Sequence, residues 1–279
     1  MNTQIFIVSG MDRGKPLLDF LATGLSVSRR KAKYLLDAHV VFVNHKRVWM
    51  ARHILMPGDE VEIQAMADRP ARTQAAPRIL YEDHDYIVVD KPAGIVSNGP
   101  DSLEQLLRDR LKIPTLVAVH RLDRDTTGCN LFARAASSRD RIIPLFKDHR
   151  IVKIYNAIVL GRVAEDPKEI SSPIDGQTAV TRIERILAVT KMASHLLVKV
   201  DTGRTHQIRK HLASIHQPIV GDKVYTTGIQ AEEVLRKVRR QMLHASRLLF
   251  QHPSTGQKIT SQASLPRDFQ QCLYMLKLG

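Results

Sequence analysis

The sequence contains few cysteines, few aromatic residues and no long hydrophobic run. Its two cysteines, Cys129 and Cys272, exclude a disulfide framework, and they do not have the spacing of zinc ligands. No uninterrupted apolar stretch reaches the roughly 18 residues of a membrane-spanning helix, and the first residues do not form a basic start to an apolar stretch. We therefore expect a cytoplasmic protein with no membrane span.

Acidic residues are also in short supply. The chain has 28 Asp and Glu against 42 Lys and Arg, a net charge of +14, to which residues 1–77 contribute +4 and the rest +10. Because long blocks of one charge are missing, a basic tail attached to a neutral enzyme is excluded. A charge spread in this way favours a polyanionic partner, with nucleic acid ahead of a membrane surface.

Nucleotide-binding loops are missing too. The chain contains no Gly-x-Gly, so the glycine-rich cofactor loop expected of an RNA methyltransferase is absent. The stretch from Gly10 to Lys15 is one residue short of a phosphate-binding loop, and Pro16 follows it. We expect no cofactor and no metal ion.

The chain divides between Gln64 and Pro77, where prolines and small residues interrupt every periodic pattern. This predicts a small domain over 1–64, a linker over 65–77 and a second domain over 78–279. The hydrophobic fraction of 43% is enough for each domain to bury a core.

The first domain concentrates cations at the start of a helix. Pro16 begins an apolar helical pattern that breaks at Thr23-Gly24, and Ser26-Val27-Ser28 offers caps for a second helix ending at Asp37. The first turns of that helix contain Arg29, Arg30, Lys31 and Lys33. Cations there oppose the helix dipole, so an external anion explains them at least as well as a solvated basic face.

This domain resembles the small RNA-binding domain of the ribosomal-protein-S-four type. The matching segments are Leu-Asp-Phe-Leu at 18–21, Ser-Arg-Arg-Lys-Ala at 28–32, Val-Phe-Val-Asn at 41–44 and Pro-Gly-Asp-Glu-Val at 57–61. Ala38 and His45 depart from it, because the family usually has glycines there, and they affect the turn geometry more than the binding. The resemblance implies a small α/β domain that binds RNA through Arg29, Arg30, Lys31 and Lys33.

The second domain mixes strands and helices without strict alternation. A hairpin is expected over 79–90, strands over 131–133, 153–160 and 195–200, and helices over 103–111 and 205–215. Gln230 to Met242 is predicted as a solvated basic helix, with RNA contact as an alternative. These patterns predict an α+β catalytic domain with a largely antiparallel mixed sheet and flanking helices.

Three clusters in this domain contain residues suited to chemistry. They are His-Arg-Leu-Asp-Arg-Asp-Thr-Thr-Gly at 120–128, Lys-Ile-Tyr-Asn-Ala-Ile-Val-Leu-Gly at 153–161, and Gly-Arg-Thr-His-Gln-Ile-Arg-Lys-His-Leu at 203–212 with Gly-Asp-Lys-Val-Tyr at 221–225. Taken singly, the first is also compatible with an ordinary loop and the second with a core tyrosine. His206 and His211 are five residues apart and do not share a helical face, so a zinc site is not expected.

Together these clusters resemble the RluA-type pseudouridine synthases. The chain differs from the family at three places. Thr127 is found where the family usually has serine, and Cys129 where it usually has an aliphatic residue. Ser97-Asn98-Gly99 is found where many relatives have a His-Pro-Gly turn. The resemblance covers Arg78 to about Phe269. None of these differences removes a residue that the chemistry needs, although Ser97 and Asn98 concern substrate contacts.

The resemblance implies that uridine in folded RNA is isomerised. Asp123 matches the family's catalytic aspartate, Arg209 its partner arginine and Tyr155 the tyrosine that stacks on the flipped uracil. Arg121 matches the arginine that fills the vacated stack, and Arg204 and His206 are expected to contact RNA.

The expected substrate is structured RNA, with large-subunit ribosomal RNA ahead of transfer RNA, and the protein is expected to act as a monomer. A non-catalytic RNA-binding or ribosome-assembly factor is the alternative from another class. It would explain the charge but would not require Asp123, Tyr155 and Arg209 together.

Overall fold

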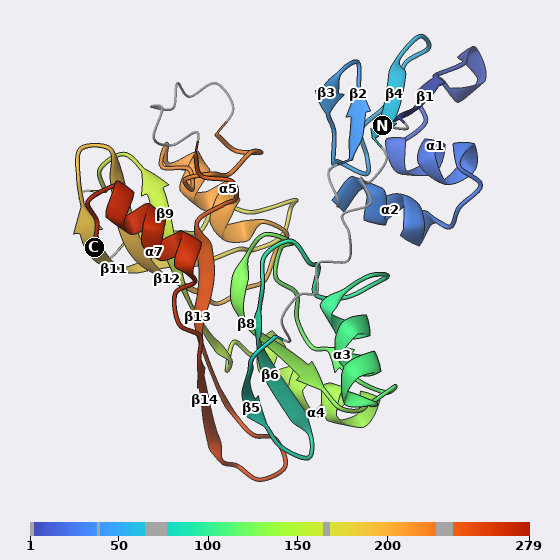
Figure 1. The fold of residues 1–279 in the computed structure, drawn as a ribbon. Helices are drawn as coiled ribbons and strands as arrows, with labels where there is room; N and C mark the ends of the chain where they lie inside the picture. Colours follow the sequence, from blue (N-terminus) through green and yellow to red (C-terminus); the bar gives the residue numbers. More distant parts are fainter. Residues whose placement is uncertain (1–2, 38–39, 65–76, 164–167, 227–236) are drawn as a thin grey trace. The chain divides into compact units, whose positions relative to one another are not determined.

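The computed structural model describes residues 3–37, 40–64, 77–163, 168–226 and 237–279. The chain separates into two compact units, Met1–Ala75 and Ala76–Gly279, called here the small unit and the large unit. Figure 1 shows the elements of each. No helix within the described ranges is long and apolar enough to cross a membrane.

The small unit packs two helices against one sheet. The helices are α1 (Leu17–Gly24) and α2 (Arg29–Asp37), after the 3-10 turn η1 (Gly10–Asp12), and the strands are β1 (Thr3–Ile7), β2 (Val41–Val43), β3 (Lys46–Arg47) and β4 (Glu60–Gln64). The sheet order is β1-β4-β2-β3, and its described pairings are antiparallel. Leu17, Leu36 and Val61 are buried in its core.

Local sequence explains how α2 begins and how β2 turns into β3. The Lys31 backbone N–H donates to Ser28 Oγ at 3.2 Å, which is an N-terminal cap. Asn44 and His45 both have positive φ, 50° and 62°, in the tight turn between the two strands. His45 therefore occupies a position that favours glycine, whereas the second departure, Ala38, lies outside the described residues.

The large unit is built on one extended sheet. Its strands are β5 (Ile79–Glu82), β6 (Tyr86–Lys91), β7 (Val117–Ala118), β8 (Thr127–Ala133), β9 (Val152–Leu160), β10 (Lys168–Ile170), β11 (Thr181–Val189), β12 (Ala193–Val200), β13 (Leu243–Gln251) and β14 (Lys258–Gln262). The order is β10-β11-β12-β9-β13-β8-β6-β5, with β14 paired to β13 and β7 to β8. Among the described pairings only β13 with β8 is parallel. The prediction of an α+β domain with a mixed, largely antiparallel sheet is confirmed.

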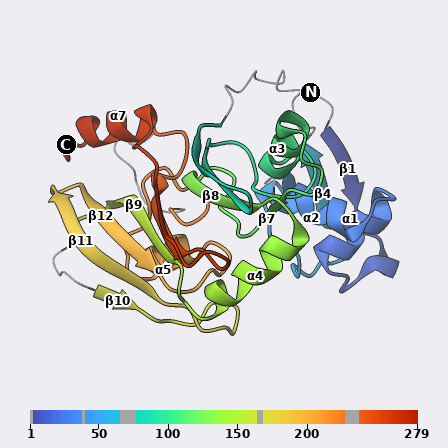
Figure 2. The same cartoon turned by 90° about the horizontal axis from the view of Figure 1, so that it is seen from below.

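Helices flank this sheet: α3 (Leu103–Leu111), α4 (Ala136–Lys147), α5 (Gln207–Ser214) and α7 (Arg267–Met275) (Figure 2). Side chains alternate across β9, so Tyr155, Ala157 and Val159 share one face and Asn156 and Ile158 the other.

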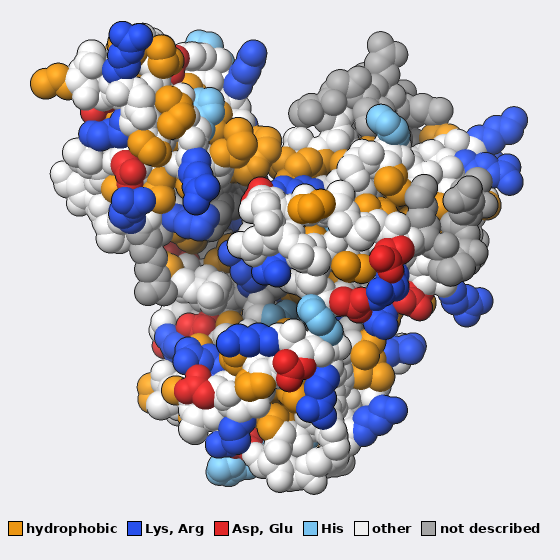
Figure 3. All heavy atoms as spheres, turned by 180° about the vertical axis from the view of Figure 1, so that it is seen from behind, with side chains coloured by type: hydrophobic (Ala, Val, Ile, Leu, Met, Phe, Trp, Pro, Cys, Tyr) orange, Lys and Arg blue, Asp and Glu red, His pale blue; other side chains and the backbone are white. Residues whose placement is uncertain are grey.

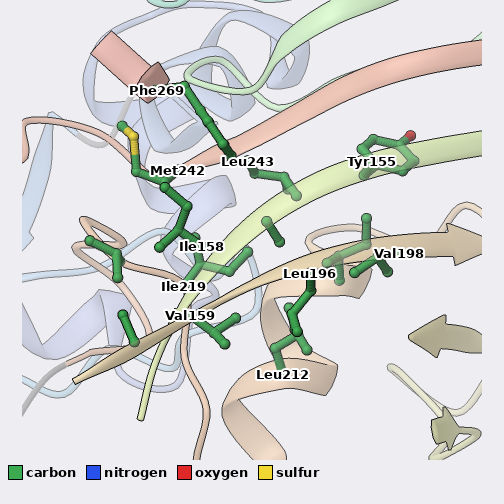
Figure 4. Packing of buried hydrophobic residues seen from close by; sticks show 14 of the residues in the cluster. Tyr155, Ile158, Val159, Leu196, Val198, Leu212, Ile219, Met242, Leu243 and Phe269 are labelled. Carbon is green, nitrogen blue, oxygen red and sulfur yellow. The ribbon is translucent and has the colours of Figure 1, made fainter. Parts of the chain in front are cut away.

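The two faces of β9 meet different helices. Ile208 and Arg209 of α5 line the same pocket as Tyr155, and the ring of Phe269 on α7 lies 5.7 Å from that of His195, which bonds to Asn156. Leu212 and Phe269 both belong to the apolar cluster around β9 and β12 (Figure 4). The central strands are thus covered on both faces, which holds Tyr155 on a rigid element.

Several elements differ from the sequence-based expectation. The strand expected over 131–133 begins earlier, at Thr127, so the loop that contains Asp123 runs directly into β8. Residues 237–242 of the expected basic helix are not helical, and 227–236 lie outside the described residues. The helix α4 was not predicted, because Pro144 interrupts its pattern; neither were β11 and β13.

On the face shown in Figure 3, positive charge does not form a single block. Figure 3 shows Lys and Arg side chains spread over both units, with Asp and Glu among them. This agrees with the distribution of charge along the sequence.

Candidate functional site

A pocket of about 560 Å³ opens in the large unit where the three sequence clusters meet. Its lining includes Asp123 from the loop before β8, Tyr155 from β9 and Arg209 from α5. Arg121, Arg204 and His206 also line it. The pocket therefore brings together the six large-unit residues selected from the sequence.

The loop that contains Asp123 is held in place by hydrogen bonds from a buried lysine. Lys91, at the end of β6, is fully buried, and its Nζ donates to the carbonyl oxygens of Pro92, Ile95 and Arg124 at 2.9, 2.7 and 2.9 Å. Burial lowers the pKa of Lys91 to about 7, against the charges of Asp125 and Asp123, which raise it. The ammonium group ties the residue after Asp123 to the turn that follows β6.

Ser97 fixes the residue before Asp123. Its buried Oγ accepts from the Leu122 backbone N–H at 2.9 Å and donates to the Leu122 carbonyl at 3.3 Å. This position is one of the departures from the family pattern, for which the sequence indicated a role in substrate contact. The serine instead positions the loop from inside.

The end of the loop rests on β13. Gly128 has φ of +106°, and a Cβ added there would lie 2.2 Å from the Ala245 carbonyl oxygen. Next to it, the hydroxyl of Thr127 and Nδ1 of His244 are hydrogen-bonded at 2.8 Å. A residue without a side chain is required for this close approach of two backbones.

We expect Gly128→Ala to destabilise the large unit by at least about 2 kcal/mol, because the methyl group meets a backbone carbonyl and the residue has positive φ. Thermal unfolding measures this effect. Gly176→Ala is the matched control, since Gly176 also has positive φ but no atom within 4 Å of the position that a Cβ would occupy. Equal destabilisation of the two variants would show that φ alone, and not the contact with β13, requires glycine at 128.

Asp123 is held by an arginine that is itself locked in place. Nη1 of Arg209 donates to Asp123 Oδ2 at 3.0 Å, while its Nε and Nη2 donate to the two oxygens of Asp222 at 2.6 and 2.9 Å. Asp222 is fully buried and the Arg209 side chain is 3% exposed, whereas Asp123 keeps 18% exposure. The bidentate pair orients the guanidinium group so that one N–H is aimed at the carboxylate in the pocket.

The charge state of Asp123 follows from its neighbours. Burial raises its pKa, but the electrostatic influence of His206, Arg209 and Arg121 outweighs burial and brings the pKa below its ordinary value. His206 Nε2 lies 3.9 Å from Asp123 Oδ1. Asp123 is therefore an ionised, partly exposed carboxylate at neutral pH.

Tyr155 lies in the pocket wall with its ring largely buried, at 7% exposure. It pairs with Ala245 of β13 and Val198 of β12, so strands on both sides hold it (Figure 4). Burial, and then the charge of Asp123, raise the pKa of its hydroxyl. The tyrosine is neutral and presents an aromatic surface beside an ionised carboxylate.

His206 closes the pocket beside Arg209. It has φ of 55° and precedes α5 as its N-cap residue, and its Nδ1 is 3.0 Å from the hydroxyl of Tyr225. The Tyr225 ring also lies 5.2 Å from the Arg209 guanidinium carbon. Tyr225 and Asp222 come from the Gly-Asp-x-x-Tyr segment, to which sequence reasoning gave no roles.

The other cations predicted to bind RNA whose side chains are described lie at the surface. Arg121 and Arg204 are exposed at the pocket, and Arg204 Nε donates to the Thr178 carbonyl at 3.0 Å. In the small unit Lys31 and Lys33 are exposed, and Arg29 forms an ion pair with Asp19 at 2.9 Å. Arg30 belongs to α2, and its side chain lies outside the described residues.

One group of side chains within the described ranges could hold a metal ion. His45, Glu60 and Glu62 of the small unit have ligand atoms within 4.8 Å of one another. Nδ1 of His45 lies 2.5 Å from Glu62 Oε1, and an exposed His–Glu pair of this kind is an ordinary surface interaction. The histidines of the pocket motifs have other partners: His211 contacts the Thr181 hydroxyl and the Ser172 carbonyl, and His120 accepts from the Leu131 N–H.

Several known proteins are similar to this chain in sequence. A family model described as RNA pseudouridylate synthase matches residues 85–214. Ribosomal large subunit pseudouridine synthase D of Vibrio parahaemolyticus is 33% identical, covering 89% of this chain and 86% of the relative. The protein of the same name from Xanthomonas campestris is 34% identical, covering 81% of this chain and 78% of the relative.

A solved structure is similar as well. Human RNA pseudouridylate synthase domain containing 4 superposes with a TM-score of 0.60 at 25% identity, covering 72% of this chain and 94% of that one. The match extends the similarity from sequence to fold. The chain belongs to the RluA-type family of RNA pseudouridine synthases, which are isomerases.

Proposed function

We propose that this enzyme isomerises uridine in large-subunit ribosomal RNA, with Asp123 as the catalytic carboxylate. The two relatives described above bear the name ribosomal large subunit pseudouridine synthase D, and this supports the choice of RNA. The observation on which the roles depend is the ionised Asp123 beside the locked Arg209 and the ring of Tyr155. An rRNA substrate also fits the net charge of +14. The enzyme is proposed to act in the cytoplasm as a monomer.

The chemistry needs an anion close to the sugar. The bond from N1 to C1′ breaks, C1′ gains positive character, and a carboxylate can either bond to it or stabilise it, as in retaining glycosidases. The uracil then turns, C5 bonds to C1′, and the hydrogen on C5 leaves as a proton while N1 regains one. Asp123 would supply the anion, Arg209 would keep it ionised, and Tyr155 would hold the uracil plane by stacking.

The direct test uses RNA labelled with tritium at C5 of uridine, because each turnover releases that hydrogen to water. Large-subunit ribosomal RNA lacking modifications should release tritium and acquire pseudouridine at defined positions. Release from transfer RNA alone would move the substrate to that class. A protein that binds both RNAs without releasing tritium from either would instead be the non-catalytic factor.

Residues 1–64 are proposed to bind RNA as a separate domain, joined by the linker 65–77 to the catalytic domain 78–279. Deleting residues 1–77 should leave a folded domain with weak activity, because Asp123, Tyr155 and Arg209 all belong to the large unit. The slope of log affinity against log salt should fall by about 0.7–0.9 for each phosphate that the small unit neutralises. An unchanged slope would show that the small unit does not touch the RNA.

Arg121 is proposed to fill the space that the flipped uridine vacates, since its exposed side chain lies at the pocket beside Asp123. Arg121→Ala should impair modification of a uridine within a stem more than that of an unpaired uridine, by an amount of the order of the unstacking cost, a few kcal/mol. Rates on paired and unpaired versions of one site measure the difference. Equal reductions on both would indicate a role in chemistry or phosphate binding.

A further inference from the structure

The large unit buries two lysines that differ in how their N–H donors are used. Lys91 gives its donors to three backbone carbonyls. Lys153 on β9 is 7% exposed, and within the described part of the chain its one hydrogen-bond acceptor is the Thr202 carbonyl at 3.1 Å. Because an ammonium group has three donors, Lys153 has capacity that the protein does not use.

Lys153 also lacks an anionic partner among the described residues. Its pKa is lowered to about 8 by burial alone. The centroid of the Phe146 ring lies 5.7 Å from Nζ, which gives only a weak cation–π contact. The carboxylate of Asp201, which lines the same pocket, is paired with Arg182 and lies 3.9 Å from Lys199. A buried cation is costly without a counter-charge, so this arrangement is suited to an external anion.

The unused N–H donors of Lys153 lie in the same pocket as the proposed reaction site. Lys153 and Tyr155 are two residues apart on one strand, so they point to the same side about 7 Å apart. Lys153 lines the pocket, as do Phe146, Lys147 and His149 at and just after the end of α4, and its Nζ lies over the ring of Phe146. Cations beside an aromatic ring are typical of surfaces that bind single-stranded nucleic acid.

We propose that Lys153 binds a backbone phosphate of the substrate RNA next to the flipped uridine, at the α4 end of the pocket. This inference deepens the proposed function and rests on it. A base stacked on Tyr155 would carry its sugar and phosphate along the same wall, where Nζ of Lys153 is the buried cation with unused donors. The contact would fix the direction in which the strand enters the pocket.

The test combines charge removal in the protein and in the RNA. Lys153→Met should weaken binding of a large-subunit ribosomal RNA fragment on the order of tenfold at low salt, and reduce the salt slope by about 0.7–0.9. Lys153→Arg should keep the slope. Lys258→Met removes the same charge from an exposed position on β14, outside the pocket, and should leave affinity and slope unchanged.

Uncharged methylphosphonate linkages, placed singly on either side of the modified uridine, then locate the contact. One of them should weaken binding to the wild type about as much as Lys153→Met does, and should cost the Lys153→Met variant nothing further. If each methylphosphonate weakens binding to Lys153→Met as much as it weakens binding to the wild type, the proposal is overturned.

A purely structural role for Lys153 is distinguished by a second variant. Lys153→Gln can still donate to the Thr202 carbonyl but has no charge, so it should behave like Lys153→Met if the phosphate contact is real. If Lys153→Gln binds RNA like the wild type while Lys153→Met does not, the lysine only supports the backbone at Thr202. Lys91→Met should lower the unfolding temperature without changing the salt slope, because its donors are satisfied internally.

The readouts separate this inference from the proposed function. An unchanged salt slope in Lys153→Met, with tritium release by the wild type, overturns the phosphate contact and leaves the function standing. A reduced slope with no tritium release from ribosomal RNA overturns the function and leaves the contact standing.

Discussion

Asp123→Asn should abolish turnover while leaving RNA binding intact. The amide keeps the shape of the side chain, but it removes the ionised group that is proposed to meet C1′ as positive charge develops. We expect saturated turnover to fall at least about a thousandfold, which corresponds to about 4 kcal/mol of lost transition-state stabilisation. Arg209 should keep its place because Asp222 holds it through two bonds.

Tritium release under single-turnover conditions measures this effect, with the dissociation constant measured in parallel. Asp140→Asn is the matched control, because Asp140 is an exposed carboxylate on α4. Retention of a tenth or more of wild-type turnover by Asp123→Asn would remove Asp123 from the chemistry.

Arg209→Ala should shift the acid limb of the turnover profile to higher pH. In the wild type burial raises the pKa of Asp123, and His206 and Arg209 are the main neighbours that lower it. Without Arg209 the pKa must rise, by about 1–3 pKa units for the removal of a close partner. Since the ionised form is the active one, turnover lost at acidic pH should return as the pH is raised.

The measurement is saturated turnover against pH for wild type, Arg209→Ala and Arg209→Lys. Lysine keeps a positive charge but cannot serve both carboxylates with a planar fork, so its profile should lie between the other two. Arg209→Ala also leaves the buried Asp222 without its cation, at a cost of about 3–5 kcal/mol in stability, so folding must be verified at each pH. A profile identical to wild type, with weaker RNA binding at every pH, would assign Arg209 to RNA binding alone.

Sequence patterns predicted the local elements better than the sheet. The first helices, the hairpin at β5 and β6, and α5 follow from periodicity and from capping by residues such as Ser28 and Ser102. The position of β13 between β9 and β8 could not be predicted, because strand order depends on contacts between distant segments.

For the site, the sequence indicated the main residues but not the contacts that support them. The motifs selected Asp123, Tyr155 and Arg209, and the pocket includes all of them. The supporting groups were missed because their partners are backbone atoms of other segments, as with Ser97 on Leu122 and Lys91 on Arg124. Lys153 was visible in its motif, but only its burial and its single acceptor distinguish it from a solvated lysine.

The insertion of β13 into the middle of the sheet has a consequence for synthesis on the ribosome. Residues 243–251 complete the pairing between β9 and β8 and contact the end of the Asp123 loop through Ala245. A nascent chain can form β5, β6 and β8 early, but the strand that joins the two halves emerges only after residues 243–251 have been translated. The partly made enzyme therefore exposes strand edges and has no finished pocket, so the emerging protein stays inactive toward RNA until β13 has been translated and has paired.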